Sequence, residues 1–511
     1  MFVDRERELK FLERSREQFE NDIKVPVAII GLRRIGKTEL IQKFRAVESE
    51  ILMPYIDLEG TTSSPETFAQ DFYLAFLREI LGKSKMRFEA VGSKREQIIA
   101  VSSKLGGEMY SKSQKLISAV DSKDYNELLK VCFSLPEEIA MELEMKVMFF
   151  VDEFQEFADL NNYRFGDVFK IMRSVVEKQE SVLYVISGSV ISFMERVVGD
   201  PAEPFFNQFR ILKLGHFTKE DSIKLIKALL KGMEIDENAL HAIFKNTLGH
   251  PFYITAVCER IALESSRDID INLVRYATLK EILDANGKIN LLFKYIFEGS
   301  LQKAKRKGYL KEILFYLAGN EGAILTEIAR HLNKPTGQVS NYISSLLQTD
   351  LVFESGKKYY YRDPIFKFWI AKTQLGKDIG ISREKKAVDD YISELEEKYL
   401  RASRELGKAK EVELRQRVEN YLGVKLENYN EGGVEFDLFG EKNGVAHIVE
   451  IKWRNKATGY REVENFVDKV KRLPVKNVKL YFVSKSGFTK KAKELMEKDG
   501  VIDISNEAVR G

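Results

Sequence analysis

The chain has 511 residues, of which 44% are apolar and 31% are charged, and its formal net charge is only +3. This length suits three or four domains of roughly 150 residues each. A net charge this small does not by itself argue for nucleic-acid binding, so any such argument must come from local patches. No apolar run approaches the roughly 18 residues that span a bilayer, the first residues lack a signal peptide's order, and the two cysteines have no metal or redox spacing. We therefore expect a cytoplasmic protein without a membrane partner.

A glycine-rich segment follows the first predicted strand. Residues 27–30 are wholly apolar, as in a buried parallel strand, and residues 39–44 have apolar side chains at helical spacing. The residues between them fit the pattern G-x-x-x-x-G-K-[ST]: Gly31, Leu32, Arg33, Arg34, Ile35, Gly36, Lys37 and Thr38. Loop amides and the end of the following helix form an anion site, so we expect Lys37 to reach the terminal phosphates of a nucleotide and Thr38 to bind Mg²⁺. The alternative is a chance glycine turn, which the flanking strand and helix disfavour.

Two acids end a later strand. Residues 51–57 predict a second strand, and residues 65–140 are mostly helical in pattern. Residues 147–151 are five apolar residues in succession, followed directly by Asp152 and Glu153. This order predicts that Asp152 is held against the Mg²⁺ shell and that Glu153 polarises the water that attacks the γ-phosphate. A solvated turn at the end of a structural strand is the alternative.

Further positions could respond to the nucleotide. Ser187 ends a predicted buried strand at 181–186, where a polar side chain could sense the γ-phosphate. Arg210 could stabilise the transferred charge, in cis or from a neighbouring chain, and a surface arginine beside a strand is an equally good interpretation. His250 and Pro251 stand at a sharp break between predicted helices, so His250 could be a nucleotide sensor or only a hinge residue.

Residues 309–362 have the pattern of a winged helix. Two predicted helices precede a third at about 337–343, and residues 351–361 predict a hairpin that turns at 355–357. A helix-turn-helix can lie in the major groove of DNA, but the outward face of this third helix is polar rather than strongly basic. We therefore expect either DNA contact or a protein-contact role. The charged, helical residues 375–405 predict a connector.

Two predicted strands near the C-terminus bring a second set of polar residues together. Asp437 lies in a strand at 433–439, and alternation puts Glu450 and Lys452 on one face of a strand at 445–453. Two carboxylates and a lysine on one sheet face can bind Mg²⁺ or Mn²⁺ and position an attacking water, as a metal-dependent nuclease requires. A half-buried hairpin with alternating polar residues is the alternative, and Asp-x₁₂-Glu-x-Lys alone is a pattern of low specificity.

Taken in order, these segments resemble the archaeal ATPase family, a branch of the STAND class close to AAA+ proteins. The matching segments are residues 2–6, 31–38, 147–153, 187–189 and 249–251, with a winged helix that runs to 369. The tail is similar to the PD-(D/E)xK nuclease-like domain. The resemblance implies ATP and Mg²⁺ as ligands, with residues 2–6 near the adenine and residues 249–251 coupling a lid to the nucleotide.

The sequence departs from these family patterns at two places. Gln208 stands near the position where the ATPase family usually has an arginine, and Arg210 comes later. Glu435 replaces the nominal proline of the nuclease motif. The helix acid of that motif is one of Glu411, Glu413 and Glu419.

We therefore predict an α/β fold with a P-loop, AAA+-like core on a parallel sheet, a helical lid, a winged helix and an α/β restriction-endonuclease-like domain. The predicted boundaries are 1–214 for the core, 215–290 for the lid, 291–375 for the winged helix, 376–405 for the connector and 406–511 for the nuclease-like domain. The predicted function is an ATP-hydrolysing switch that acts on DNA. The alternatives are an ATP-regulated, Mg²⁺-dependent DNA endonuclease and a non-cleaving DNA- or protein-binding scaffold. A protein partner or a homo-oligomer is compatible with each.

Overall fold

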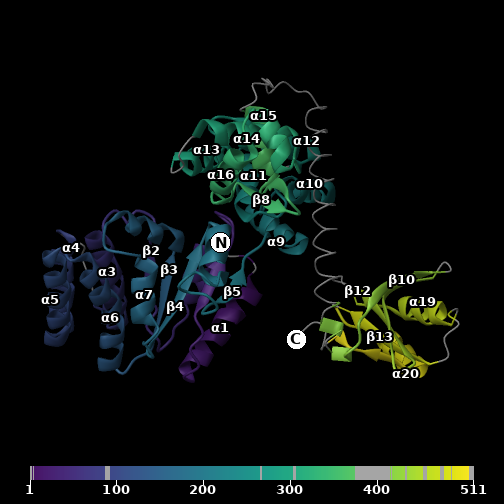
Figure 1. The fold of residues 1–511 in the computed structure, drawn as a ribbon, viewed down its shortest axis with the longest axis horizontal. Helices are drawn as coiled ribbons and strands as arrows, with labels where there is room; N and C mark the ends of the chain where they lie inside the picture. Colours follow the sequence, from purple (N-terminus) through teal and green to yellow (C-terminus); the bar gives the residue numbers. More distant parts are fainter. Residues whose placement is uncertain are drawn as a thin grey trace. The chain divides into compact units, whose positions relative to one another are not determined.

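A computed structural model of the chain describes residues 3, 5–86, 92–264, 268–302, 307–373, 415, 417–419, 421–431, 434–452, 457–471, 473, 477–484 and 486–505. The chain divides into two compact units, Met1–Leu395 and Glu396–Gly511 (Figure 1). The predicted connector at 376–405 lies outside the described residues, as do Phe2, Asp4, Glu411 and Glu413.

The first unit is built on a parallel sheet of five strands in the order β2-β3-β4-β1-β5. The strands are β1 (Val27–Ile30), β2 (Tyr55–Asp57), β3 (Val147–Asp152), β4 (Val182–Gly188) and β5 (Arg210–Lys213). Every residue of β1, β3 and β4 is buried. Because helices cover both faces of the sheet, these strands are continuous apolar runs rather than alternating ones. The predicted α/β core with a parallel sheet is confirmed.

Two helices pack on one face of this sheet. These are α1 (Glu6–Glu20) and α2 (Lys37–Arg45), whose side chains Leu12 and Phe44 join Ile29 of β1 in one apolar cluster. Since α2 begins at the last residues of the glycine-rich loop, this packing fixes the loop against the carboxyl end of β1.

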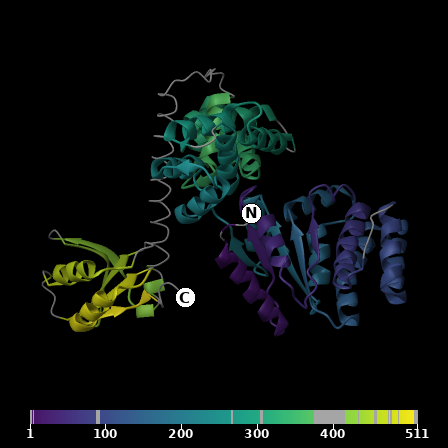
Figure 2. The same cartoon turned by 180° about the vertical axis from the view of Figure 1, so that it is seen from behind.

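The other face carries a thicker layer of helices, which Figure 2 shows from behind. They are α3 (Pro65–Lys83), α4 (Lys94–Leu105), α5 (Gly107–Ser122), α6 (Tyr125–Glu142), the 3₁₀ helix η1 (Phe154–Asn162), α7 (Val168–Val176) and α8 (Ile191–Gly199). The ring of Phe72 stacks on that of Phe149 in β3, with centroids 4.4 Å apart. Strand residues that point this way, such as Ala28 and Tyr184, belong to the same large apolar cluster.

A mostly helical region follows β5. Its elements are α9 (Lys219–Leu229), β6 (Glu234–Ile235), α10 (Glu237–Thr247), α11 (Pro251–Glu264), β7 (Asp268–Ile269), α12 (Ile271–Leu283), α13 (Lys288–Gln302), α14 (Lys307–Gly319), α15 (Leu325–Leu332), α16 (Thr336–Leu347), β8 (Val352–Ser355), β9 (Lys358–Tyr361) and α17 (Pro364–Thr373). One apolar cluster runs through all of its long helices, from Leu225 to Ile370. The antiparallel hairpin β8–β9 follows α16 directly.

The second unit has a mixed sheet of five strands in the order β10-β11-β12-β13-β14. Its elements are β10 (Glu427–Glu431), β11 (Val434–Lys442), β12 (Val445–Lys452), α19 (Tyr460–Val470), β13 (Val478–Ser484), α20 (Lys490–Asp499) and β14 (Val501–Asp503). The first three strands pair antiparallel and the last three pair parallel. Helices α19 and α20 pack with one face of the sheet in an apolar cluster that includes Ile448 and Phe466.

No helix among the described residues of either unit has the length and apolar character that crossing a bilayer requires.

Candidate active site

The glycine-rich loop bends between β1 and α2 as the motif requires. Gly36 has φ +99°, a left-handed conformation that favours glycine, and it directly precedes α2. A Cβ on Gly31 would lie 2.7 Å from the carbonyl oxygen of Leu214, so only glycine fits there without a shift. The loop is thus set by local backbone demands, and it presents its amides at the N-terminal end of α2, where anions bind favourably.

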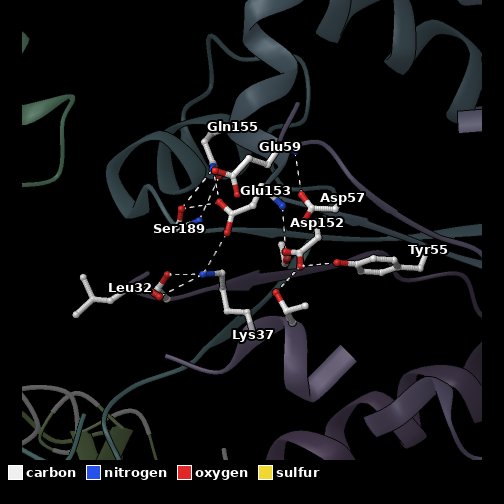
Figure 3. Close-up of polar contacts among 12 residues, drawn as sticks. Leu32, Lys37, Tyr55, Asp57, Glu59, Asp152, Glu153, Gln155 and Ser189 are labelled. Atoms are coloured by element: carbon white, nitrogen blue, oxygen red, sulfur yellow. Dashed lines mark hydrogen bonds and ion pairs between the residues drawn. The ribbon is translucent and has the colours of Figure 1, made fainter. Parts of the chain in front are cut away.

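Lys37 lies inside this loop with little solvent exposure. Its Nζ donates to the carbonyl oxygens of Gly31 and Leu32, both at 3.2 Å, and lies 3.9 Å from Oε1 of Glu153 (Figure 3). Burial lowers the pKa of Lys37, and the nearby charges of Glu153 and Asp152 act against that shift. The ammonium group is therefore held next to the loop but has no tight carboxylate partner, so an incoming phosphate can attract it.

Asp152 is the centre of a hydrogen-bond network at the end of β3. Its Oδ2 accepts from the hydroxyl of Thr38 at 2.6 Å and from that of Tyr55 at 3.1 Å. Its Oδ1 accepts from the backbone amide of Glu153 at 3.0 Å and from the hydroxyl of Ser187. Asp152 is fully buried, and these four donors explain how a carboxylate is tolerated there. The structure thus brings together Thr38, Asp152 and Ser187 from three separate segments.

Glu153 follows in a left-handed conformation, with φ +50°, which turns its side chain out of the strand. Its Oε2 accepts from the hydroxyl of Ser189 at 2.6 Å and from the side-chain amide of Gln155. The amide oxygen of Gln155 in turn accepts from the backbone amide of Ser189 at 3.2 Å. Two side chains therefore orient the carboxylate that faces Lys37 (Figure 3).

Tyr55 and Gln155 also belong to this network, although no motif in the sequence marks them. Tyr55 was part of a predicted strand, but which strand lies beside β3 is a matter of sheet order. In the structure Asp57 of β2 pairs with Asp152 of β3, which brings Tyr55 within reach of that carboxylate. Gln155 is two residues after Glu153, so its proximity was visible, but its orientation was not.

A cavity of about 750 Å³ opens in front of these residues, between the loop and the helices after β5. It is lined by Val3, Arg5, Arg33, Arg34, Ile35, Gly36, Lys37, Thr38, Glu39, Asp57, Glu59, Glu153, Phe217, Leu225, Pro251, Phe252, Thr255, Leu292 and Tyr295. The charged loop and acids form one part, and apolar residues such as Val3, Phe217 and Leu225 form another. Volume and lining both suit a nucleotide.

A model of ATPase domains predominantly from Archaea matches residues 2–257, which is half of the chain. The chain belongs to this family of ATPases. Membership implies ATP hydrolysis with Mg²⁺. The residues present fit that metal, because the hydroxyl of Thr38 and the carboxylate of Asp152 are the oxygen donors that Mg²⁺ prefers.

Several solved structures align with this chain. The Walker-type ATPase of Pyrococcus abyssi aligns at 16% identity over 72% of this chain and 96% of that chain, with a TM-score of 0.50. The ORC2 protein of Aeropyrum pernix aligns at 14% identity over 76% and 95%, with a TM-score of 0.42. The RuvB Holliday junction branch migration motor of Thermotoga maritima aligns at 14% identity over 72% and 95%, with a TM-score of 0.33. No curated protein matches the sequence.

In this member of the ATPase family, His250 and Pro251, which were both expected near the nucleotide, take different places. Pro251 lines the cavity of about 750 Å³ in front of the glycine-rich loop. His250 is buried behind the loop, in a smaller cavity of about 110 Å³ that Leu32 and Ser189 also line. Its ring stacks on Tyr253 with centroids 4.0 Å apart, and neither ring nitrogen has a hydrogen-bond partner among the described residues. Burial strongly lowers the pKa of His250, so the ring is neutral.

Arg210 is not brought to this site within the chain. It begins β5 opposite Val27, the first residue of β1, whereas the loop follows Ile30 at the other end of that strand. Because β1 and β5 run parallel, Arg210 lies at the amino edge of the sheet and the ATPase site at the carboxyl edge. The fold therefore does not bring Arg210 to the γ-phosphate of a nucleotide bound in the same chain.

In the second unit, Glu450 and Lys452 lie together on β12. The Nζ of Lys452 donates to Oε1 of Glu450 at 2.6 Å, and Oδ2 of Asp437 accepts from the backbone amide of Ile451 at 2.7 Å. The other oxygen of Glu450, Oε2, is buried and has no hydrogen-bond partner among the described residues. Burial and the charge of Asp437 raise the pKa of Glu450.

Glu419, one of the candidate helix acids, forms a local hydrogen bond in this unit. Its Oε1 accepts from the backbone amide of Leu426 at 2.8 Å, which holds the segment that leads into β10. Within the part of the chain that the structure describes, no three His, Cys, Asp or Glu side chains are grouped as metal ligands.

Proposed function

We propose that the chain is an ATP-driven molecular switch that acts on DNA. The observation that carries the proposal is the hydrogen bond from Thr38 to Asp152, which joins the glycine-rich loop to the end of β3 beside Lys37 and Glu153. These are the phosphate-binding, metal-binding and water-activating positions of one hydrolytic site. Ser187, from a third segment, supports Asp152 in that arrangement.

The side chains divide the work of hydrolysis. The loop amides hold the phosphates, and Lys37 exchanges the carbonyl oxygens of Gly31 and Leu32 for phosphate oxygens. Thr38 and Asp152 would hold Mg²⁺, which would neutralise phosphate charge when bound. Glu153 accepts the proton of the attacking water, and Ser189 keeps its carboxylate in position.

The same segments connect the site to the helices after β5. Directly after Ser189 the chain enters α8, and the carboxylate of Asp350 accepts from the backbone amide of Ser192 at 3.0 and 3.1 Å. Arg362 donates to the same carboxylate at 3.1 Å. A change at the γ-phosphate can bias this contact only through different interactions in the ATP and ADP states.

The proposed division keeps 1–214 as the core, 215–290 as the lid and 291–375 as the winged helix, and assigns 406–511 to the nuclease-like domain.

The DNA part of the proposal rests on residues 307–373. Helices α14, α15 and α16 with the hairpin β8–β9 have the order of a winged helix. Exposed cations gather at the hairpin turn, Lys357 and Lys358, and on α15, Arg330. On α16, Asn341 and Ser344 are exposed and able to reach a groove. A protein-contact role is the alternative for this surface.

Steady-state hydrolysis of ATP tests the site. We expect Lys37→Ala to lose at least about 100-fold in kcat/KM, and Glu153→Gln to lose hydrolysis while ATP stays bound. Trapped nucleotide can be measured by filtration after incubation with ATP and Mg²⁺. Full turnover by both variants contradicts the proposal.

Fluorescence anisotropy with a labelled duplex tests the DNA partner. Removing both wing lysines, in Lys357→Ala with Lys358→Ala, should weaken binding and reduce its salt dependence by a slope of about two. The matched control removes two exposed lysines from α6 and α7, in Lys130→Ala with Lys170→Ala. Equal losses in the two double variants would assign the binding to general charge and not to the wing.

A second candidate function is a metal-dependent DNA endonuclease regulated by the switch. The observation that favours it is the buried Oε2 of Glu450, beside Asp437 and Lys452, which has no hydrogen-bond partner within the described part of the chain. A second Mg²⁺ or a Mn²⁺ ion would meet that unsatisfied charge, and Lys452 would position the attacking water. We expect plasmid DNA to be cut by the unaltered chain with either metal and not by Asp437→Ala. Cutting by both points to a contaminant, whereas binding without cutting favours a scaffold that has kept only the nuclease-like fold.

A further inference from the structure

The glycine-rich loop contains an arginine at a position where the motif specifies no residue type. Its place in the fold indicates a role. Arg33 is the third residue of the glycine-rich loop, and it is half-buried. Its guanidinium lies over the ring of Tyr295 in α13, with Cζ 5.5 Å from the ring centroid. Among the described residues, this guanidinium has neither a hydrogen bond nor a carboxylate partner. Within the described part of the chain, the contact that holds this cation is therefore an aromatic face.

Tyr295 is itself tied to the acidic side of the cavity. Its hydroxyl donates to Oε1 of Glu59 at 3.0 Å, and the backbone amide of Glu59 donates to Oδ1 of Asp57 at 2.9 Å. Asp57 pairs with Asp152 across β2 and β3. Figure 3 shows Glu59, Asp57, Asp152 and Glu153 on the same side of Lys37. Arg33 is therefore anchored next to the part of the cavity where the proposed site places Mg²⁺ and the terminal phosphate.

Space around Arg33 allows its side chain to move. Arg33, Glu59 and Tyr295 line the nucleotide cavity and also a second cavity of about 500 Å³ beyond it. The three residues form the partition between these two spaces. A contact with an aromatic face is weaker than charge-assisted hydrogen bonds from an arginine to a phosphate. A phosphate within reach would therefore attract the guanidinium away from the ring.

We propose that Arg33 stabilises the charge on the terminal phosphate of ATP in cis during hydrolysis, and that the ring of Tyr295 holds it when no phosphate is there. The inference rests on the proposed ATPase function. In the reaction, the water oxygen bonds to the γ-phosphorus while the bond to the β–γ bridging oxygen breaks. The water proton goes to Glu153, and ADP leaves with the electron pair of the broken bond. Arg33 neutralises negative charge on the oxygens around that phosphorus, a task that Arg210, at the other edge of the sheet, cannot perform for its own chain.

Kinetics of Arg33→Ala and Arg33→Lys in the full chain test this role. We expect Arg33→Ala to lower kcat by about 10²–10³-fold, as for the loss of one charge-stabilising donor, with the Kd for ADP changed less than about threefold. Affinity for ADP with aluminium fluoride, which imitates the transferred phosphoryl group, should fall together with kcat. Arg33→Lys should recover part of kcat, and added guanidinium ion should recover part of it in Arg33→Ala. A purely structural role would lower ADP affinity in parallel and would not respond to guanidinium, and that result overturns the proposal.

Two further variants make the outcomes distinguishable. Arg196→Ala is the matched control, because Arg196 in α8 also lies over an aromatic ring, that of Phe193 at 5.3 Å, and is not among the residues that line the nucleotide cavity. Its kcat should equal that of the unaltered chain. Hydrolysis that is lost in Lys37→Ala but kept in Arg33→Ala contradicts the role of Arg33 alone. Absence of any Lys37-dependent hydrolysis contradicts the proposed function, and the role of Arg33 with it.

Discussion

The two units both place carboxylates on neighbouring strands, but they surround them differently. In the first unit, Asp152 is fully buried and accepts four hydrogen bonds, from three hydroxyls and one amide. In the second unit, Glu450 is also buried, but among the residues that the structure describes only its Oε1 has a partner, the ammonium group of Lys452. One carboxylate is satisfied by the fold itself and the other is not.

This difference shows two ways of keeping a charge inside a protein. A carboxylate with enough donors is stable without a ligand, so the ATPase site is organised before nucleotide arrives. A carboxylate left with an unpartnered oxygen costs folding free energy unless a cation or a proton meets it. We therefore expect the chain to lose stability when Asp152 is replaced. We expect it to gain stability when the charge of Glu450 is removed.

The largest effect is expected for Asp152→Ala. The variant leaves the hydroxyl of Ser187 and the amide of Glu153 buried without their acceptor, which should lower the free energy of unfolding by about 1–3 kcal/mol. It also removes a proposed metal ligand, so ATP hydrolysis should fall at least about 100-fold. Chemical denaturation and steady-state kinetics measure the two effects.

Asp57→Ala, on the neighbouring strand, is the comparison. The carboxylate of Asp57 accepts one amide hydrogen bond, from Glu59, and its loss should cost less stability. Equal costs would mean that the four-donor network is not what stabilises Asp152.

An opposite and smaller effect is expected for Glu450→Gln in the second unit. Burial and the charge of Asp437 raise the pKa of Glu450 above its ordinary value of 4.5. The folded state therefore favours the protonated form, and the cost of ionising Glu450 is present above the raised pKa and disappears below pH 4.5. The isosteric amide should raise the unfolding midpoint of the full chain at pH 8, and the gain should vanish as the pH falls to 4.

Glu441→Gln is the matched control, because Glu441 is exposed on the neighbouring strand β11. It should leave the midpoint unchanged at both pH values. A variant Glu450→Gln that is less stable than the unaltered chain at pH 8 would show that the pairing with Lys452 outweighs the cost of burial.

The smallest effect separates single hydrogen bonds in the two units. Tyr55→Phe removes one of the four donors to Asp152, and Tyr481→Phe removes the hydrogen bond between Tyr481 and Nδ1 of His447 at 3.2 Å. Each should lower the free energy of unfolding by about 0.5–1.5 kcal/mol, with the larger loss at Tyr55, whose acceptor is a buried carboxylate. Denaturant titration of both variants measures the difference. A larger loss at Tyr481 would contradict the view that the ATPase site has the stronger network.

Local signals in the sequence determined the ATPase core. The glycine-rich loop from Gly31 to Thr38 needs specific backbone angles and a following helix, and the strand that ends in Asp152 is a continuous apolar run. Both features arise from residues close together in the chain, where steric and burial rules act directly. The residues Asp437, Glu450 and Lys452 were found by alternation along strands, which is also a local rule.

Only the tertiary structure decided which segments meet. The order of the parallel strands puts β2 beside β3, and this places Tyr55, Asp57 and Glu59 at the site although no local pattern marks them. The direction of β5 takes Arg210 to the far edge of the sheet, whereas the packing of α13 brings Tyr295 over Arg33. Sheet order and helix packing depend on contacts between residues far apart in the chain. The periodicity of the sequence does not encode such contacts. The sequence therefore placed Arg33 in the loop, but only the tertiary structure brought the ring of Tyr295 to its guanidinium.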